Sequence, residues 1–202
     1  MMNDNSLLSD FVIKTLDHLK KDDATQIHRI HLDSLSNDVM PNLGLAVEAR
    51  YLAKLMKADN GAVIVASSKD EIVGFLLLRF AELNMKEFLS VWSILRFVIL
   101  SLVKPIIMIR LIYQLVKSSA NPKGSCEVDY FAVSDSMRGI GIGGKLLEEA
   151  EKVAFKKNYS SIVTKTNNVR LCSYYRNAKE AKLISSFRIL KDEYFNVCWS
   201  IR

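Results

Sequence analysis

Four glycines within positions 139–144 have a spacing suited to binding a phosphate group, and they are half of the eight glycines in the 202-residue chain. Gly139, Gly141 and Gly144 match the dinucleotide fingerprint G-x-G-x-x-G. That fingerprint needs glycines directly after the first strand of the fold and an acid roughly 20 residues later. Here SDSMR separates the preceding strand from Gly139, and the next strand ends in TKTNN, without a carboxylate. The chain left after Gly144 is also too short for a second nucleotide-binding half, so we exclude a dinucleotide fold.

The nucleotide P-loop is a second interpretation, because Gly139, Gly144 and Lys145 nearly reproduce its spacing. The P-loop needs serine or threonine directly after the lysine to ligate magnesium. Leu146 stands at that position and cannot bind a metal. No later apolar strand ends in an acid suited to magnesium either. We therefore exclude a P-loop as well.

The third interpretation is R-x-x-G-x-G, formed by Arg138, Gly141 and Gly143. A strand, CEVDYFAV, leads into the bend, and the glycines open a helix. Free N–H groups at a helix start converge with the positive end of its dipole and can bind a pyrophosphate such as that of coenzyme A. Glycine keeps the backbone close to the phosphate and permits positive φ. We therefore expect the cofactor to bind along the whole loop: Arg138, Gly139, Ile140, Gly141, Ile142, Gly143, Gly144 and Lys145.

Composition limits the class of protein and the kinds of partner. Half of the residues are hydrophobic, a quarter are charged and the formal net charge is +6, which is typical of one globular domain over residues 1–202. The positive charge favours anionic partners, such as a phosphorylated cofactor, a nucleotide-linked substrate or an acidic membrane surface, although solubility alone could explain it. We expect no nucleic-acid partner. The three cysteines have no metal-ligand spacing, and MMNDNSLLSD lacks the apolar core of a signal peptide. Both features favour reduced thiols in the cytoplasm.

Hydrophobic periodicity predicts the elements that position the loop. Strands are expected at 11–16, 62–68, 72–80, 126–133 and 160–166, followed by a terminal hairpin. Helices are expected after Asp22 or Asp23, at 45–57, after the glycine loop and at 169–178. The order is a strand, two helices, a β-hairpin, an insertion, and then β-loop-α-β-α-β-β.

The insertion, residues 84–119, is strongly apolar. Its longest uncharged run, FVILSLV, lies between Arg96 and Lys104, whereas a membrane span needs roughly 20 residues. Pro105 is expected to divide the segment into two helices. Its basic residues are Lys86, Arg96, Lys104, Arg110 and Lys117, against the single acid Glu87. Four roles stay open: contact with a membrane surface, contact with a second subunit, a cap over the acceptor cleft, or additional core.

From Leu16 to its end, outside 86–117, the chain resembles the GNAT superfamily of N-acetyltransferases. The stretch VSDSMRGIGIGGKLLEEAE looks like the acetyl-CoA motif of that superfamily. Downstream, Tyr175 follows Asn168 by seven residues, as in the pattern N-x-x-A-x-x-x-Y. Upstream, Glu127 stands six residues before Val133, where some members carry a catalytic carboxylate. The sequence departs from the pattern where Leu171 replaces a small residue and where the usual LGF after the tyrosine is missing.

The resemblance implies an α/β fold with a mostly antiparallel mixed sheet flanked by helices, and a two-helix insertion between the third and fourth strands. It implies transfer of an acetyl group from acetyl-CoA, as cosubstrate, to a primary amine. The backbone of Phe131, Ala132 and Val133 would align the pantetheine arm and polarise the thioester carbonyl. Tyr175 would protonate the leaving sulfur, and Asn168 would bind the pantetheine or orient its helix.

For the general base the resemblance implies Glu127, with Asp129 on the same strand face as its rival. No metal is expected: His28 and His31 lie one helical turn apart, but no third ligand stands near them in sequence.

Only similarity to other GNAT members narrows the chemical class of the acceptor. GNAT members similar to acetyltransferases of polysaccharide and nucleotide-sugar pathways carry a comparable basic, apolar insertion. They also have an early helix similar to IHLDSL, followed by a segment similar to LGLAVEARYL. This similarity implies an amino-sugar nucleotide or a related glycan precursor. Acetylation of a protein amine or a polyamine is an alternative. A non-catalytic acyl-CoA sensor and a membrane-surface adaptor are alternatives from other functional classes.

Overall fold

The fold is described from a computed structural model, which describes residues 11–57, 60–81, 91–109, 112 and 121–201. The strands are β1 (Val12–Thr15), β2 (Gly61–Ser68), β3 (Glu71–Arg79), β4 (Ser125–Val133), β5 (Ser161–Thr166), β6 (Lys182–Ile189) and β7 (Asp192–Ser200). The helices are α1 (Lys21–Ser34), α2 (Val39–Leu43), α3 (Leu45–Leu55), α4 (Val91–Val103), α6 (Ile142–Lys156) and α7 (Val169–Ala178), and a short 3-10 helix, η3, covers Asp135–Met137.

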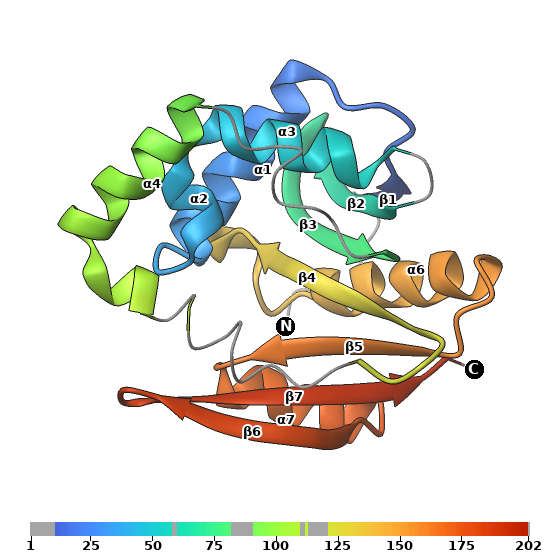
Figure 1. The fold of residues 1–202 in the computed structure, drawn as a ribbon. Coiled ribbons are helices and arrows are strands. Elements are labelled where there is room, and N and C mark those ends of the chain that lie inside the picture. Colours follow the sequence, from blue (N-terminus) through green and yellow to red (C-terminus); the bar gives the residue numbers. More distant parts are fainter. Residues whose placement is uncertain (1–10, 58–59, 82–90, 110–111, 113–120, 202) are drawn as a thin grey trace.

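The strands form one seven-stranded sheet in the order β1-β2-β3-β4-β5-β7-β6 (Figure 1). β4 and β5 pair in parallel, and every other neighbouring pair is antiparallel. The parallel pair needs a crossover, and the glycine loop with α6 supplies it. The sheet confirms the predicted mostly antiparallel α/β architecture.

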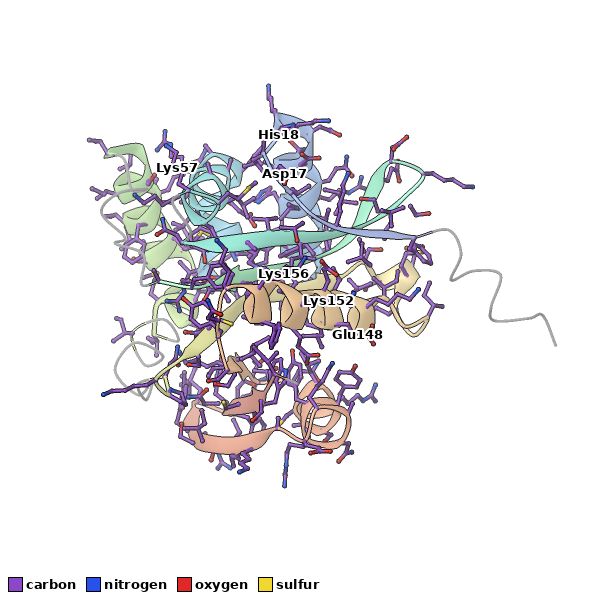
Figure 2. The ribbon with its side chains drawn as sticks, turned by 90° about the vertical axis from the view of Figure 1, so that its right-hand side faces the viewer. Asp17, His18, Lys57, Glu148, Lys152 and Lys156 are labelled. Atoms are coloured by element: carbon purple, nitrogen blue, oxygen red, sulfur yellow. The ribbon has the colours of Figure 1, made fainter. Side chains whose placement is uncertain are left out.

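The two faces of the sheet carry separate cores because side chains alternate along each strand. On one face, Val63 and Val65 of β2 pack with α1, α2 and α3. On the other face, Ile64 and Ala66 pack with α6 and α7. The opposite side of α6 is polar, and Figure 2 shows Glu148, Lys152 and Lys156 along it.

The structure corrects two predictions of local structure. The N-cap of α1 is Lys20 rather than Asp22 or Asp23; Asp23 instead accepts a hydrogen bond from the Lys20 backbone N–H at 3.0 Å. The sequence analysis also missed α2, because its five residues, VMPNL, are too few to show a helical period. Gly44 ends α2 with φ +90° and allows α3 to start at once.

The described part of the insertion is helical on both sides of a break. α4 ends at Val103, Lys104 lies in the break, and residues 105–109 are helical again. This arrangement confirms two helices between β3 and β4; residues 84–90, 110–111 and 113–119 lie outside the described residues. Leu100, Ile107 and Met108 join the core cluster of α1 and α3. Among the residues described, none of the helices combines the length and hydropathy of a membrane span.

Candidate active site

The glycine loop turns the chain from β4 into α6 with two left-handed residues. Gly139 has φ +84° and Gly141, the N-cap of α6, has φ +89°. L-residues with a Cβ rarely adopt this conformation. The glycine spacing noted in the sequence therefore corresponds to a real backbone requirement at these two positions.

The first turn of α6 presents backbone donors with no cap. No side chain of the described residues caps the helix, and its first turn holds no acid. The Lys145 N–H already bonds to the Gly141 carbonyl at 3.2 Å, so the N–H groups of residues 142–144 are the ones that helix geometry leaves open. Together with the helix dipole they can bind an anion.

Two close contacts fix how the loop packs. A Cβ on Gly143 would lie 3.0 Å from Cζ of Phe131, and a Cβ on Gly144 would lie 3.3 Å from the Tyr174 hydroxyl. Glycine at 143 therefore lets the first turn of α6 approach β4. Glycine at 144 lets Tyr174 of α7 approach the same turn.

Arg138 ties the loop to its surroundings. Its Nε donates to the Val133 carbonyl at 3.0 Å, and its Nη2 donates to Ser34 Oγ at 3.1 Å and pairs with Asp135 at 2.7 Å. The side chain is half exposed, at 52%. Arg138 thus fastens the loop to the end of α1, and its guanidinium still faces solvent. Its direct contact with a pyrophosphate remains a prediction.

β4 and β5 part beside this loop. Their parallel register runs from Ser125↔Ser161 to Val128↔Thr164, whereas β4 continues to Val133. At the same point β4 contains a bulge, because Leu78 pairs with Val128 and Leu77 pairs with Tyr130. Beyond Val128, therefore, no β5 residue pairs with β4 in the described chain. The backbone of Phe131, Ala132 and Val133 lies in this stretch, which pairs with β3 but has no strand on its β5 side. An extended ligand could add its own hydrogen bonds there.

Asn168 caps α7. Its Oδ1 accepts the Leu171 N–H at 3.1 Å, which fixes the start of the helix that carries both tyrosines. The side chain is otherwise exposed, so its amide Nδ2 can still donate to a ligand. The structure therefore shows an orienting contact for Asn168, while its contact with pantetheine stays untested.

The adjacent tyrosines face in different directions. Tyr175 is 1% exposed and stacks on Trp199 with 5.2 Å between ring centroids. Burial raises the pKa of its hydroxyl, so Tyr175 keeps its proton at neutral pH. Tyr174 is 38% exposed, and its hydroxyl lies against Gly144. Both can serve as proton donors chemically, and Tyr174 is the one that lies against the glycine loop.

Glu127 lies in a network of ion pairs. Arg79 Nη2 lies 2.5 Å from its Oε2 and Lys165 Nζ lies 2.9 Å from its Oε1. Asn121 Nδ2 also donates to Oε2 at 2.7 Å. Burial acts to raise the pKa of Glu127, but the charges of Arg79 and Lys165 outweigh it and leave the pKa below its ordinary value. Glu127 is therefore a carboxylate at neutral pH with weak basicity.

Asp129 shares Arg79 with Glu127 but has the opposite pKa shift. Arg79 Nε lies 2.9 Å from Asp129 Oδ1, and the Tyr51 hydroxyl donates to Oδ2. Burial raises the pKa of Asp129, and the nearby charge of Glu127 adds to this effect while Arg79 opposes it. Two neighbouring carboxyls with opposed shifts can divide the work of an acid–base site.

Four residues of this network were missed in the sequence analysis: Arg79, Tyr51, Lys165 and Asn121. Arg79 is the last residue of β3 and follows an apolar run. In the antiparallel register it stands opposite Glu127, and that cross-strand pairing is the signal that could have found it. Tyr51 lies 78 positions before Asp129, and no local pattern joins them.

His28 and His31 meet a single carboxylate. Their Nδ1 atoms each lie 2.5 Å from one oxygen of Glu48, whose side chain is fully buried. Burial acts to raise the pKa of Glu48, and the two histidines lower it further than burial raises it. The ring of His31 packs 4.4 Å from that of Tyr130, next to the bulge of β4. This cluster braces α1 and α3 against the strand beside the site.

A family model covers most of the chain. The model of the acetyltransferase (GNAT) family matches residues 25–178, which span the loop, β4 and α7. No curated protein sequence matches the chain.

Solved structures share the fold at low identity. A GNAT-family acetyltransferase structure from Desulfovibrio desulfuricans has 11% identity, coverage of 95% of this chain and 99% of the other, and a TM-score of 0.62. A ribosomal-protein-alanine N-acetyltransferase from Brucella melitensis has 13% identity, coverage of 94% and 99%, and a TM-score of 0.61. Ard1 from Thermoplasma volcanium has 13% identity, coverage of 96% and 99%, and a TM-score of 0.58.

Proposed function

The chain belongs to the acetyltransferase (GNAT) family, and on that premise we propose that it acetylates a primary amine on a small anionic acceptor such as a nucleotide-linked amino sugar. It is an acetyltransferase that uses acetyl-CoA as its cosubstrate. The observation that supports binding of the acetyl donor is the uncapped first turn of α6 beside the end of β4 that has no partner on its β5 side.

The cosubstrate would bind along these two features. Its pyrophosphate would accept hydrogen bonds from the N–H groups of residues 142–144, with the charge of Arg138 nearby. Its pantetheine arm would run beside residues 131–133, and its amides would bond to the β4 backbone as a neighbouring strand does. The thioester would then lie near the bulge of β4, between the loop and the Arg79 network.

The reaction needs a neutral amine and a stabilised oxyanion. The acceptor ammonium would lose a proton, and its nitrogen would attack the thioester carbon. A backbone N–H of β4 would stabilise the negative oxygen of the tetrahedral intermediate. The C–S bond then breaks, and the Tyr175 hydroxyl would protonate the departing thiolate. Tyr174 is the alternative donor because its hydroxyl lies against the loop.

Glu127 is the proposed proton acceptor, acting through water. Its lowered pKa supports the required carboxylate form at neutral pH. Its negative charge would also attract the acceptor ammonium and hold it near the thioester. Asp129 is the rival because its pKa is raised, which makes it the stronger base.

The anionic acceptor rests on charge. The chain carries a formal net charge of +6; Arg79 and Lys165 are already paired with Glu127 and Asp129 and add no local excess to it. A nucleotide diphosphate on the acceptor would complement this charge. A polyamine, by contrast, would be repelled by it.

Thiol release from acetyl-CoA tests the proposal. The acceptor panel is a nucleotide-linked amino sugar, the same amino sugar without its nucleotide, a polyamine and a peptide with a free N-terminus. We expect the highest kcat/KM for the nucleotide-linked sugar and a loss when the nucleotide is removed. A preference for the peptide or the polyamine would contradict the acceptor class. Binding of coenzyme A without turnover of any amine would instead indicate an acyl-CoA sensor.

A further inference from the structure

Lys165 brings an amine to the point where β4 and β5 part. The last residue pair between the two strands joins Val128 to Thr164, and Lys165 is the next residue of β5. Figure 1 shows the two strands diverging towards their carboxyl ends. Glu127 pairs with Val163, and Lys165 lies two residues further along β5, so both side chains lie on the same face of the sheet. The register of the sheet therefore places a lysine beside the stretch of β4 proposed to hold the pantetheine arm.

The Lys165 ammonium contacts the carboxylate that we propose as the general base. Its Nζ lies 2.9 Å from Glu127 Oε1. The other oxygen, Oε2, already accepts hydrogen bonds from Arg79 and Asn121. The Glu127 side chain is 9% exposed and that of Lys165 is 26% exposed, so water reaches this contact poorly. An amine held here can pass a proton directly to the carboxylate.

Lys165 is better suited than Arg79 to move from the carboxylate towards the donor. The planar Arg79 guanidinium bonds to both Glu127 and Asp129, and a guanidinium stays protonated. The lysine amine is carried on a flexible four-carbon stem and becomes a nucleophile once it loses a proton. A rotation of this stem can shift Nζ towards the bulge of β4 while the pairing of β5 with β7 keeps the backbone in place.

We propose that Lys165 is acetylated by the active site of its own chain, with acetyl-CoA as the donor. The proposal rests on the proposed function, because it needs the thioester to lie beside the bulge of β4. It also goes beyond that function, because it assigns a modification site within the chain. The nucleophile is covalently held next to the base, so this transfer needs no acceptor from solution.

The chemical step uses the same groups as transfer to a soluble amine. Nζ loses one proton to Glu127, and its lone pair forms a bond to the thioester carbon. The C–S bond breaks with its electron pair on sulfur, and the α7 tyrosine that serves as general acid protonates the thiolate. The second proton lost by Nζ restores that tyrosine, and Glu127 releases its proton to water. The products are an acetylated Lys165, coenzyme A and one free proton.

Labelled acetyl-CoA and peptide mass spectrometry of the full chain test the proposal. The chain is incubated without any amine and with acetyl-CoA that carries a deuterated acetyl group, so that only newly transferred groups are counted. We expect the labelled fraction at Lys165 to exceed that at every other lysine by about tenfold or more, because its amine is held beside the base. Lys165→Arg keeps the positive charge and should lose this label.

Two other ion-paired lysines are matched controls. Lys179 Nζ lies 3.0 Å from Glu151, and its side chain is 14% exposed. Lys152 Nζ lies 3.2 Å from Glu149, and its side chain is 67% exposed. Both carboxylates belong to α6, away from the point where β4 and β5 part. Acetic anhydride, which modifies amines according to their exposure, should label Lys152 before Lys165, the reverse of the order with acetyl-CoA.

Kinetics test the role of Glu127 and whether each chain modifies itself. Glu127→Gln should lower the rate of labelling at Lys165 by about 100-fold, because the amine loses its proton acceptor. Glu149→Gln, on the exposed side of α6, should leave that rate unchanged. The rate constant should not depend on protein concentration if each chain acetylates its own lysine. Circular dichroism checks that every variant is folded.

Several results would overturn the proposal. Acetyl-CoA labelling that follows exposure, with Lys152 ahead of Lys165, would indicate chemical acetylation. A rate constant that rises in proportion to protein concentration would mean that one chain modifies another. An unchanged rate in Glu127→Gln would remove that carboxylate from the step.

Thiol release on the amine panel, measured with the same wild-type protein, separates this proposal from the proposed function. Turnover of a soluble amine without any label at Lys165 would overturn self-acetylation and leave the proposed function standing. Absence of both label and thiol release would overturn both.

Discussion

Phe131 of β4 fills the space that a side chain at Gly143 would need, since a Cβ there would lie 3.0 Å from the Phe131 Cζ atom. The start of α6 and the end of β4, which has no partner on its β5 side, therefore approach each other closely. These are the two features proposed to hold the pyrophosphate and the pantetheine arm. A change at either residue should alter cofactor binding.

Gly143→Val should weaken coenzyme A binding by about tenfold, because overpacking against Phe131 displaces the first turn of α6 at a cost of about 1–3 kcal/mol. Isothermal titration calorimetry measures the effect. Adding Phe131→Leu makes room for the valine and should recover part of the affinity. Unchanged affinity in well-folded Gly143→Val would show that coenzyme A does not depend on this turn.

Tyr175→Phe should lower kcat by roughly 100-fold while the Kd for acetyl-CoA stays nearly constant, as expected for loss of a general acid. The change removes only a hydroxyl, so the stacking on Trp199 should survive. Tyr174→Phe is the matched variant, measured with the same amine. A loss confined to Tyr174→Phe would transfer the acid role to the tyrosine beside Gly144.

The acid limb of the pH–rate profile separates the two carboxyls. If Glu127 accepts the proton, activity should fall only below about pH 4.3, because its folded pKa lies under that ordinary value. If Asp129 does so, the fall should begin above about pH 3.9, because its pKa is raised. With Glu127 as base, Glu127→Gln should lower kcat more than Asp129→Asn does. The reverse order would identify Asp129.

Glu48→Gln should lower the free energy of unfolding by about 3 kcal/mol, because it leaves a buried histidine without its acceptor. Urea unfolding measures the loss. The folded pKa of Glu48 is lowered, so its stabilising contribution is present above about pH 4.3 and declines as the pH falls through the folded pKa. The difference in free energy of unfolding between the wild type and Glu48→Gln should shrink as the pH falls over that range.

Glu149→Gln is the control for that experiment. Glu149 pairs with Lys152 at 3.2 Å on the exposed side of α6. Such exposed pairs contribute about 0–1 kcal/mol. If Glu149→Gln lowered the free energy of unfolding as much as Glu48→Gln does, the buried His28–Glu48–His31 cluster would stabilise the fold no more than an exposed ion pair.

The sequence predicted features that depend on neighbouring residues. Gly139 and Gly141 were placed in a phosphate-binding turn because their spacing is local, and both have the positive φ that the turn requires. The hydrophobic periods of strands and helices predicted the strands of the sheet and the helices α1, α3, α6 and α7, with bounds that differ from the structure by a few residues. The break of the insertion at Pro105 followed from the missing N–H of proline.

Features that depend on tertiary packing could not be predicted in the same way. Which of Tyr174 and Tyr175 enters the core depends on the position of Trp199, which arrives on the last strand. The pairing of Arg79 with Glu127 and Asp129 depends on strand register and on the bulge of β4. In the sequence, Glu48 looks like an ordinary charged residue of an amphipathic helix. Its contact with His31 depends on the packing of α1 against α3.

The parting of β4 from β5 has a consequence for how such enzymes diversify. Recognition along that gap and along the first turn of α6 would rely on peptide groups, which every residue possesses. Most side chains around the cosubstrate could then change over evolution without loss of acyl transfer. Selection would thus be free to reshape the acceptor pocket while the cosubstrate stays the same.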